Sequence, residues 1–277
     1  MLRSLWRLVI LLVGIGLVWV MARIIYPYAN EYMPAFFVLL FLYIFFAYIG
    51  LPMLIRLLRI FIKPNHIPVY VTTGDGWPSD PVNLALIVKD RAHLVRAMKK
   101  AGWHEADPLT IKNGFREVVS ILFNTPYPEA PLSNLYLFNR PQDLSFEIPT
   151  GDKKSARTRH HVRFWRLEEP LTHHNAHHYA FWTKQLKHLI LPGKEMWIGA
   201  ATEETHPIDI QWRTGQLTHG GSHDSDRERD YIIDTLEKVR GVSEIHTSRA
   251  GETIRFRGQQ IRTVYISNGS IKIARLK

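Results

Sequence analysis

The stretch that decides the architecture is YMPAFFVLLFLYIFFAYIGLPMLI, residues 32–55, which contains no charged side chain. A helix needs about 20 apolar residues to cross the hydrocarbon core of a bilayer, because each residue adds only about 1.5 Å of length. This run meets that requirement. It predicts a transmembrane helix at about residues 33–55.

A second apolar run, LVILLVGIGLVWVMA at residues 8–22, precedes it and lies between Arg7 and Arg23. It reaches the length of a span, at about residues 5–26, when Trp6 is counted and the Arg23 side chain extends to the interface. A cleaved signal peptide is the alternative interpretation. The lack of a small-x-small cleavage motif and the second run that follows at once favour a transmembrane hairpin.

Basic residues lie at both ends of this hairpin, residues 1–63, and the segment that connects the two runs has none. The connection, YPYANEYMP (26–34), carries tyrosines, which favour the membrane–water interface. By the positive-inside rule we expect a multi-pass protein of a bacterial-type inner (plasma) membrane with both termini cytoplasmic, although Arg23 opposes this orientation. RLLRIFIK (56–63) is predicted to continue as a basic amphipathic exit helix along anionic head groups. Membrane lipids, contacted through two spans, are therefore expected partners.

The net charge of +10 over 277 residues raises the question of an anionic partner. Residues 1–63 hold six basic side chains and one acidic side chain, so half of the excess belongs to the apolar segment. The other half is spread over the rest of the chain, which argues against nucleic acid as a partner. The chain has no cysteine, which excludes disulfides, thiolate nucleophiles and Cys-type zinc sites.

The remainder reads as an α+β domain, with a mixed or antiparallel sheet and flanking helices, over residues 82–277. A linker at 64–81 is predicted from the Gly, Pro and Asp residues of TTGDGWPSDP. Residues 242–277 form a candidate small β subregion, in which Asn268-Gly269 predicts a hairpin. Periodicity predicts helices over 89–102, over 110–123 and from a Ser225/Glu228 capping box to Gly241. Strand-like segments between these helices are NLYLF, LSFEI, RHHVRFWR, MWIGAAT and IDIQWR.

The strand RHHVRFWR (159–166) carries paired histidines between arginines. Successive side chains of a strand point to opposite faces. His160 is therefore expected near the core, and His161 is expected on the more open face with Arg159, Arg163 and Trp165. His161 and Arg163 together would suit an anionic group, since guanidinium is a planar donor and imidazole exchanges a proton near neutral pH.

A second polar segment, LTHGGSHDSDRERD (217–230), contains His219 and several carboxylates. The helix that begins near Ser225 would offer amide donors to an anion. If this segment meets the paired histidines, then His160, His161 and His219 are candidate ligands of a divalent metal. His161, His219 and Asp230 are then the candidate catalytic residues of metal-assisted water activation. The alternative is structural: a hydrogen-bonded sheet histidine beside an acidic helix N-terminus.

THHNAHHYAFWTKQLKH (172–188) would place pairs of histidines four residues apart on a helix. Such pairs chelate metals adventitiously, so an exposed insertion helix is the favoured interpretation. No phosphate-binding glycine loop, G-x-S-x-G motif or kinase motif occurs in the sequence, and the motifs therefore do not identify a reaction.

Several ordered motifs resemble the LssY C-terminal-like domain family over roughly residues 68–245: DPVNLALIV, AGWHEADPL, PLSNLYLFNRPQDLSFE, RHHVRFW, WIGAAT and THGGSHDSDRERDY. The family's domain often accompanies membrane segments, and its activity is not established. The resemblance implies a shared site or core made of Arg159, His160, His161, Arg163, Trp165, Thr218, His219, Glu228, Arg229 and Asp230. Some proteins of the family also contain a lipid-phosphatase part. This sequence shows no lipid-phosphatase motif, so the resemblance does not imply lipid-phosphatase activity.

Two functions fit these observations. The first is an inner-membrane-anchored protein whose cytoplasmic domain binds an anionic ligand or a protein partner. Its expected ligand-binding residues are Arg159, Arg163, Trp165, Thr218 and Arg229. The alternative is a metal-assisted hydrolase or transferase that acts on a membrane-associated anionic substrate.

Overall fold

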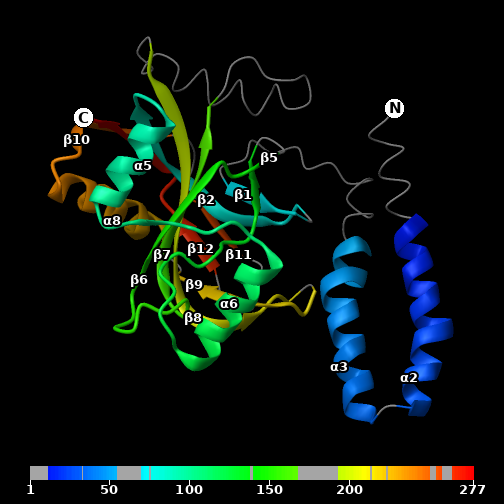
Figure 1. Cartoon of the computed structure of the whole chain (residues 1–277). Coiled ribbons are helices and arrows are strands. Elements are labelled where there is room, and N and C mark those ends of the chain that lie inside the picture. Colours follow the sequence, from blue (N-terminus) through cyan, green and yellow to red (C-terminus); the bar gives the residue numbers. More distant parts are fainter. Residues whose placement is uncertain are drawn as a thin grey trace. The chain divides into compact units, whose positions relative to one another are not determined.

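The structure is a computed structural model of the whole chain (Figure 1). It divides into two compact units, one of Met1–Asn65 with Gln211–Gln216 and one of His66–Ile210 with Leu217–Lys277. The residues that the structure describes are 12–32, 34–54, 70–74, 76–137, 140–167, 193–212, 214–222, 224–249, 254–257 and 264–277. The predicted exit helix at 56–63 and the histidine-rich segment at 172–188 lie outside them.

The N-terminal unit contains a helix of membrane length. It covers Ala35–Leu54, with α3 at Ala35–Phe45 followed by a π-helical stretch, η2, at Phe46–Gly50. These 20 residues contain no charged side chain. Pro34 precedes the helix in an extended conformation and so fixes its start. Length and composition therefore suit a membrane span, as the sequence predicts.

The first apolar helix, Leu12–Tyr28, is shorter. It includes a π-helical stretch, η1, at Met21–Ile25 and runs on into α2 at Tyr26–Tyr32. Of the helices in the described ranges, one is long and apolar enough to cross a membrane. Of the two predicted spans, only the second run therefore forms a helix of spanning length, because the described apolar part of the first helix falls short of that length. The helix lengths leave the multi-pass topology unsupported.

The C-terminal unit is built on one curled sheet of 11 strands, a half-barrel (Figure 1). The main path has the order β3-β6-β7-β8-β2-β1-β4-β5; β9 pairs with β8, and β13 pairs with β10 and with β2. The pairing of β13 with β2 is parallel and the other described pairings are antiparallel. The bounds are β1 Tyr70–Thr73, β2 Pro78–Val88, β3 His104–Glu105, β4 Leu135–Leu137, β5 Arg140–Pro141, β6 Leu144–Pro149, β7 Arg159–Arg166, β8 Glu195–Ile210, β9 Leu217–Gly221, β10 Val242–Arg249 and β13 Ser270–Leu276. The α+β class is confirmed.

Three helices accompany the sheet: α5 at Arg91–Lys100, α6 at Ile111–Phe123 and α8 at Ser225–Lys238. Each helix is capped at its N-terminus by a side chain that accepts a hydrogen bond from a backbone amide. The accepting residues are Asp90, Thr110 and Asp224, respectively. The predicted capping box at Ser225 is therefore displaced by one residue, because the Asp224 carboxylate takes the amide of Arg227.

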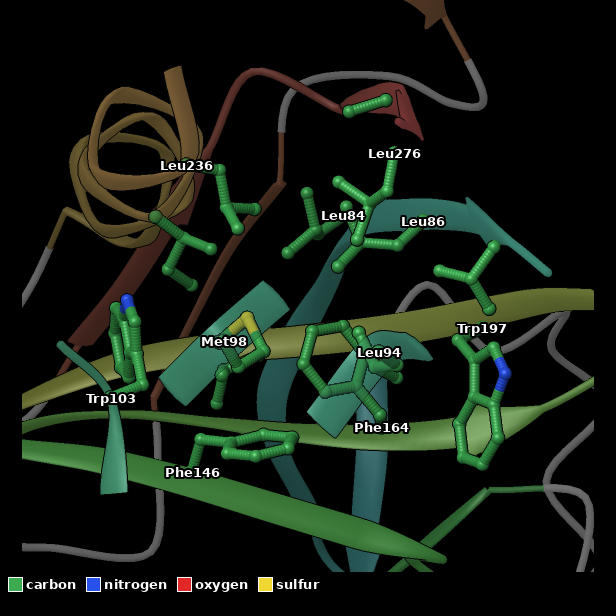
Figure 2. Packing of buried hydrophobic residues seen from close by; sticks show 14 of the residues in the cluster. Leu84, Leu86, Leu94, Met98, Trp103, Phe146, Phe164, Trp197, Leu236 and Leu276 are labelled. Atoms are coloured by element: carbon green, nitrogen blue, oxygen red, sulfur yellow. The ribbon is translucent and has the colours of Figure 1, made fainter. Parts of the chain in front are cut away.

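One face of the sheet is covered by α5 and α8 (Figure 1). Figure 2 shows the core between these layers, where Phe146 and Phe164 of the sheet meet Met98 of α5 and Leu236 of α8. The Trp103 indole lies in this core and donates to Thr235 Oγ1 at 2.9 Å. A second core cluster on the other face contains Val71, Ile87, Leu135, Leu137, Trp165, Ile198 and Ile273. Both faces of the central strands are therefore buried.

The C-terminal segment differs from its prediction. Strands β10 and β13 belong to the main sheet, and a separate two-stranded sheet is formed by β11 (Ile254–Arg257) and β12 (Val264–Ser267). Gly269 has a positive φ of 74°, as a tight turn requires, but the turn passes from one sheet to the other. In the described residues β12 pairs with β11 and β13 pairs with β10 and β2, so the predicted hairpin is wrong.

The predicted linker at 64–81 is also too long. Strand β1 occupies Tyr70–Thr73, and β2 begins at Pro78. Pro78 is the first residue of β2, and Pro78 and Pro81 pair with β1 on either side of a register shift. A missing amide hydrogen is tolerated at a strand start or an irregularity of this kind. Turn-forming residues therefore mark a tight β1–β2 connection within the domain.

Candidate functional site

The two histidines of β7 lie on opposite faces of the sheet. The register with β8 places Arg159 opposite Glu204, and His160 opposite Glu203. Because side chains alternate along a strand, His161 shares the face of Arg159 and Glu204. This alternation is the one that the sequence predicts.

The relative burial of the histidines is the reverse of the prediction. The His161 side chain is 4% exposed and that of His160 is 17% exposed. The face that carries His161 is closed because the sheet curls, Leu135 of β4 packs into its core, and Glu117 of α6 reaches Arg159. The expectation of an open, ligand-accepting face at His161 is therefore wrong.

Arg159 is surrounded by three carboxylates from three different elements. Its Nε lies 2.7 Å from Glu204 Oε2, its Nη1 2.8 Å from Glu147 Oε2, and its Nη2 3.0 Å from Glu117 Oε1. Arg159 and Glu147 are almost completely buried, and Glu117 is the most exposed of the four at 17%. One guanidinium thus faces three acids inside the domain.

This imbalance changes how the acids ionise. Burial raises the pKa of Glu147 to about 8; Arg159 lowers it, but the negative charges of Glu204 and Glu117 add to the effect of burial. At Glu204 burial also acts upward, yet Arg159, His219 and His161 outweigh it and hold the pKa below its usual range. Near neutral pH the protonated form of Glu147 is therefore favoured.

Asp80 joins the same face from β2. Its Oδ2 lies 2.9 Å from Arg163 Nη1 and 3.8 Å from His161 Nε2, and its Oδ1 accepts the Tyr265 hydroxyl at 2.9 Å. Burial opposes ionisation, but His161, Arg163 and Tyr265 outweigh it and lower the pKa of Asp80 to about 2. Burial, followed by the charge of Arg163, lowers the pKa of His161. Burial thus favours the neutral form of His161, which lies between Asp80 and Glu204.

His219 of β9 meets this cluster from its more exposed side. Its Nδ1 lies 3.7 Å from Glu204 Oε2 and its Nε2 3.8 Å from Glu117 Oε1, while His161 Nδ1 lies 3.8 Å from Glu204 Oε1. These separations exceed hydrogen-bond length. His161 Nδ1, His219 Nδ1 and Glu147 Oε1 are buried and have no hydrogen-bond partner among the described residues. Two of the predicted catalytic residues, His161 and His219, thus converge on Glu204.

A second cluster lies on the opposite, helix-covered face. One ligand atom from each of His160, Glu203 and Glu228 lies within 4.8 Å of the other two, as in a metal site. His160 Nδ1 is 2.8 Å from Glu228 Oε2, and the Tyr231 ring stacks on the imidazole with centroids 4.1 Å apart. Glu228 is 3% exposed, and its Oε1 has no partner within the described part of the chain. Burial raises the pKa of Glu228 against the effect of His160.

The predicted metal set and catalytic set are only partly assembled. His160 belongs to the helix-covered face, whereas His161 and His219 approach Glu204 on the other. Asp230 lies on α8, 42% exposed, where it pairs with Arg229 and Lys272 at 2.7 and 2.9 Å. The two clusters are separated because consecutive residues of one strand supply His160 and His161.

The predicted ligand-binding residues already have partners inside the domain. Arg159 and Arg163 pair with buried carboxylates, and Arg229 pairs with two aspartates of its own helix. Trp165 is buried in the second core cluster and donates to a backbone carbonyl at 3.2 Å. Thr218 lies on β9, opposite a residue of β8. These residues contribute to the architecture of the sheet and helix in this structure.

The expected anion site at the start of α8 is acidic. A surface hollow of about 610 Å³ lies there, lined by Asp224, Asp226, Arg227, Arg229, Asp230, Ile266 and Asn268. Asp224 accepts the Arg227 amide, and Asp226 accepts the Asn268 amide at 2.6 Å. A carboxylate therefore already occupies one of the helix amides that an anion would need, and further carboxylates line the hollow.

The sequence does not single out the acids of the two clusters: Asp80, Glu117, Glu147, Glu203 and Glu204. The sequence does contain a pattern that could have identified Glu203 and Glu204. These adjacent acids follow the predicted strand MWIGAAT, and side-chain alternation places one on each face of the sheet, as it does for the adjacent histidines. Asp80 was missed because residues 64–81 were predicted to be a linker, whereas Asp80 lies in β2.

Comparison with known proteins gives a family. The family model described as LssY C-terminus matches residues 64–264. A search of curated proteins finds no match, and a search of solved structures finds none either. The match covers most of the chain and includes both clusters, and the chain therefore belongs to the LssY C-terminus family.

Proposed function

We propose that the protein is a membrane-anchored domain that binds a divalent cation through His160, Glu203 and Glu228. The observation that carries this proposal is the buried Glu228 carboxylate, whose Oε1 lacks a partner within a cluster of metal-ligand spacing. The anchor is the apolar helix Ala35–Leu54. The distribution of basic residues favours a cytoplasmic location for the domain at a bacterial-type plasma membrane.

The two apolar helices of the N-terminal unit are suited to enter the bilayer together. A Cβ atom on Gly14 would lie 2.1 Å from Met53 Sδ, so the lack of a side chain allows the helices to approach closely. Large side chains elsewhere are exposed, including Phe36 at 68%, Leu39 at 66% and Trp19 at 59%. Small residues between helices and apolar residues on the outside are typical of membrane helix pairs.

The geometry of the second cluster suits a divalent metal. Imidazole and carboxylate ligands bind zinc at about 2.0–2.2 Å, so two ligand atoms of one ion lie at most about 4.4 Å apart. The mutual limit of 4.8 Å in this cluster requires only a small closure of the side chains. Two carboxylates and one imidazole also leave an excess of negative charge for a cation to neutralise. Stacking by Tyr231 fixes the plane of the His160 ring.

A cation is favoured over the anionic ligand suggested by the arginine-rich strand. Arg159 and Arg163 are buried and neutralised by acids, so an anion would first have to separate these pairs. Separation of a buried ion pair costs about 3–5 kcal/mol. The acids exceed the cations in both clusters, which supports binding of positive charge.

Metal-assisted hydrolysis or group transfer is the second candidate function. Three protein ligands leave a coordination position open, which is the arrangement of catalytic rather than structural zinc sites. A membrane-associated substrate follows from the anchor. This second function adds a reaction to the proposed site and requires the same three ligands.

The test is metal binding by the full-length protein, purified without a histidine tag and reconstituted in lipid nanodiscs. Zn²⁺ and Mn²⁺ are titrated by calorimetry after removal of metal. We expect one site whose affinity falls about tenfold or more in His160→Ala and in Glu228→Gln. The matched control is His246→Ala, which removes an exposed histidine paired with Glu244 at 2.7 Å and should leave that site unchanged.

The histidine-rich segment is a source of unrelated metal binding. The parent for all these variants therefore carries alanine at His173, His174, His177 and His178. If His160→Ala and Glu228→Gln bind metal with the parent's stoichiometry and affinity, the proposed site does not exist. Anchoring is tested separately, because the intact chain should remain with membranes after an alkaline carbonate wash.

A further inference from the structure

Helix α6 carries an apolar face that the domain does not cover. Its apolar residues recur at helical spacing, as the sequence predicts, but they point away from the core rather than into it. Their exposed fractions are Ile111 95%, Phe115 71%, Val118 51%, Leu122 59% and Phe123 71%, and Leu109, which precedes the helix, is 55% exposed. A monomeric soluble domain rarely exposes a contiguous apolar stripe of this kind.

Polar contacts explain why the helix has this orientation. On its inner side, Glu117 pairs with Arg159 at 3.0 Å. Ser120 accepts the Ala156 amide at 3.0 Å, and Arg157 Nε donates to the Ile121 carbonyl at 2.7 Å. These contacts fix α6 to the sheet through its polar side, so its apolar side faces outward.

The neighbouring strands extend the apolar surface. His219 of β9 lies 3.8 Å from Glu117 of α6, which places the β8–β9 ribbon beside the helix. In that ribbon Ile210 and Leu217 form a cross-strand pair, and they are 43% and 53% exposed. The surface formed by α6 and this pair is called the α6 face below.

The charge around the α6 face fits a lipid head-group layer. The exposed charged side chains of α6 are Lys112 and Arg116, both basic, whereas its acid Glu117 points inward. Arg116 Nη1 lies 3.9 Å from Asp107 Oδ2, so an acid beside the helix balances part of its charge. Basic residues beside an apolar stripe are typical of helices that lie in the interface of an anionic bilayer. Fifteen residues separate Leu54 of the membrane helix from Tyr70 of the domain, a reach of at most about 58 Å.

We propose that the α6 face docks on the surface of the anionic membrane that holds the protein, with Ile111, Phe115 and Leu122 in the head-group region. The inference rests on the membrane anchoring proposed above and is independent of the cation site. The tether keeps the domain near the bilayer, so a weak apolar and basic contact suffices for docking. The docked face would bring the Glu117–His219 edge of the polar cluster to the membrane surface.

The test uses the lack of cysteine in the chain, which allows a single nitroxide label at a chosen position. Ile111→Cys and Phe115→Cys are labelled in the full-length protein, in nanodiscs of phosphatidylcholine with phosphatidylglycerol. The matched control is Glu237→Cys, an exposed position on α8. Collisions with oxygen, which concentrates in lipid, are compared with collisions with a water-soluble nickel chelate.

We expect the labels at positions 111 and 115 to collide several-fold less with nickel than the control label, and more with oxygen. Ile111→Asp should abolish this pattern at position 115, because it places a charge on the apolar stripe. Two results overturn the proposal. In the first, the labels at positions 111 and 115 collide with nickel as often as the control label. In the second, they collide with neither nickel nor oxygen, which indicates that protein rather than lipid covers the α6 face. A carbonate wash of the same samples distinguishes failed docking from failed anchoring.

Discussion

Arg159 and Glu204 face each other across strands β7 and β8, with the guanidinium Nε 2.7 Å from Glu204 Oε2. Both side chains are buried, at 2% and 10% exposure. The pair is part of a larger cluster, since Glu117 and Glu147 contact the same guanidinium. Loss of Arg159 would therefore leave three acids without their shared cation, in a region where water cannot replace it.

Arg159→Met should strongly destabilise the C-terminal domain. Removing one partner of a buried ion pair costs about 3–5 kcal/mol, because the remaining charge is uncompensated. The measurement is the midpoint of thermal unfolding of the full-length protein in nanodiscs, followed by tryptophan fluorescence. The control is Arg91→Met, which removes an exposed pair with Glu105 at 3.3 Å and should cost less than about 1 kcal/mol. Equal effects of the two variants would contradict a buried structural role for Arg159.

Glu147 should make stability decrease with pH. Its pKa is raised from 4.5 to about 8, so the folded state holds a proton that the unfolded state releases. The stabilisation is fully present below about pH 4.5, declines as the pH rises and is lost above about pH 8. The groups that face Glu147 are Arg159, Glu204 and Glu117. The lowered pKa of His161 makes stability increase with pH, but only below about pH 6.5. The stability measurements are therefore compared from about pH 7 to 9.

Glu147→Gln tests this pH dependence, because an amide resembles the protonated acid and remains neutral. We expect the variant to match the wild type near about pH 7 and to unfold at a higher temperature near about pH 9. Glu237→Gln on the exposed side of α8 is the control and should follow the wild-type curve. Parallel curves for wild type and Glu147→Gln would show that Glu147 is ionised throughout.

The sequence predicted the structure best where a single local pattern of residues determines it. Twenty uncharged residues without a break predict Ala35–Leu54, and alternation separates His160 from His161. It was less informative where partners come from distant elements. Apolar spacing predicts a helix over 110–123 but not which side of it is covered, and the buried pairing of Glu117 with Arg159 turns the polar side inward.

The polar cluster around Arg159 and Glu204 was predicted only in part, because its residues also come from distant elements. His161 and His219 were expected to approach each other, and both lie beside Glu204. The acids that define their environment come from β6, β8 and α6, and the register between strands determines which of them meet. Composition cannot supply that register. The net positive charge even suggested an anion, whereas the interior holds acids in excess.

The close approach of the two N-terminal helices should depend on Gly14. A Cβ atom there would lie 2.1 Å from Met53 Sδ, whereas one on Gly16 would meet nothing within 4 Å. Gly14→Ile should separate the helices at a cost of about 1–3 kcal/mol, and Gly16→Ile should be close to neutral. The measurement is the SDS fraction at which helical circular dichroism is lost from detergent-solubilised protein. An equal shift for both variants would exclude a specific contact at Gly14.

Gly199 in β8 should tolerate no side chain. It pairs with Phe164 of β7 and with Leu84 of β2, and a Cβ atom would lie 2.9 Å from Phe164 Cε1 and 3.2 Å from Leu84 Cβ. Gly199→Ala should therefore destabilise the domain by about 1–3 kcal/mol through overpacking, although alanine suits a strand no worse than glycine. Gly151→Ala is the matched control, because a Cβ atom there meets nothing within 4 Å. A lower unfolding temperature for Gly199→Ala alone is the expected result, and unchanged stability would mean that β7 and β2 approach Gly199 less closely than the structure shows.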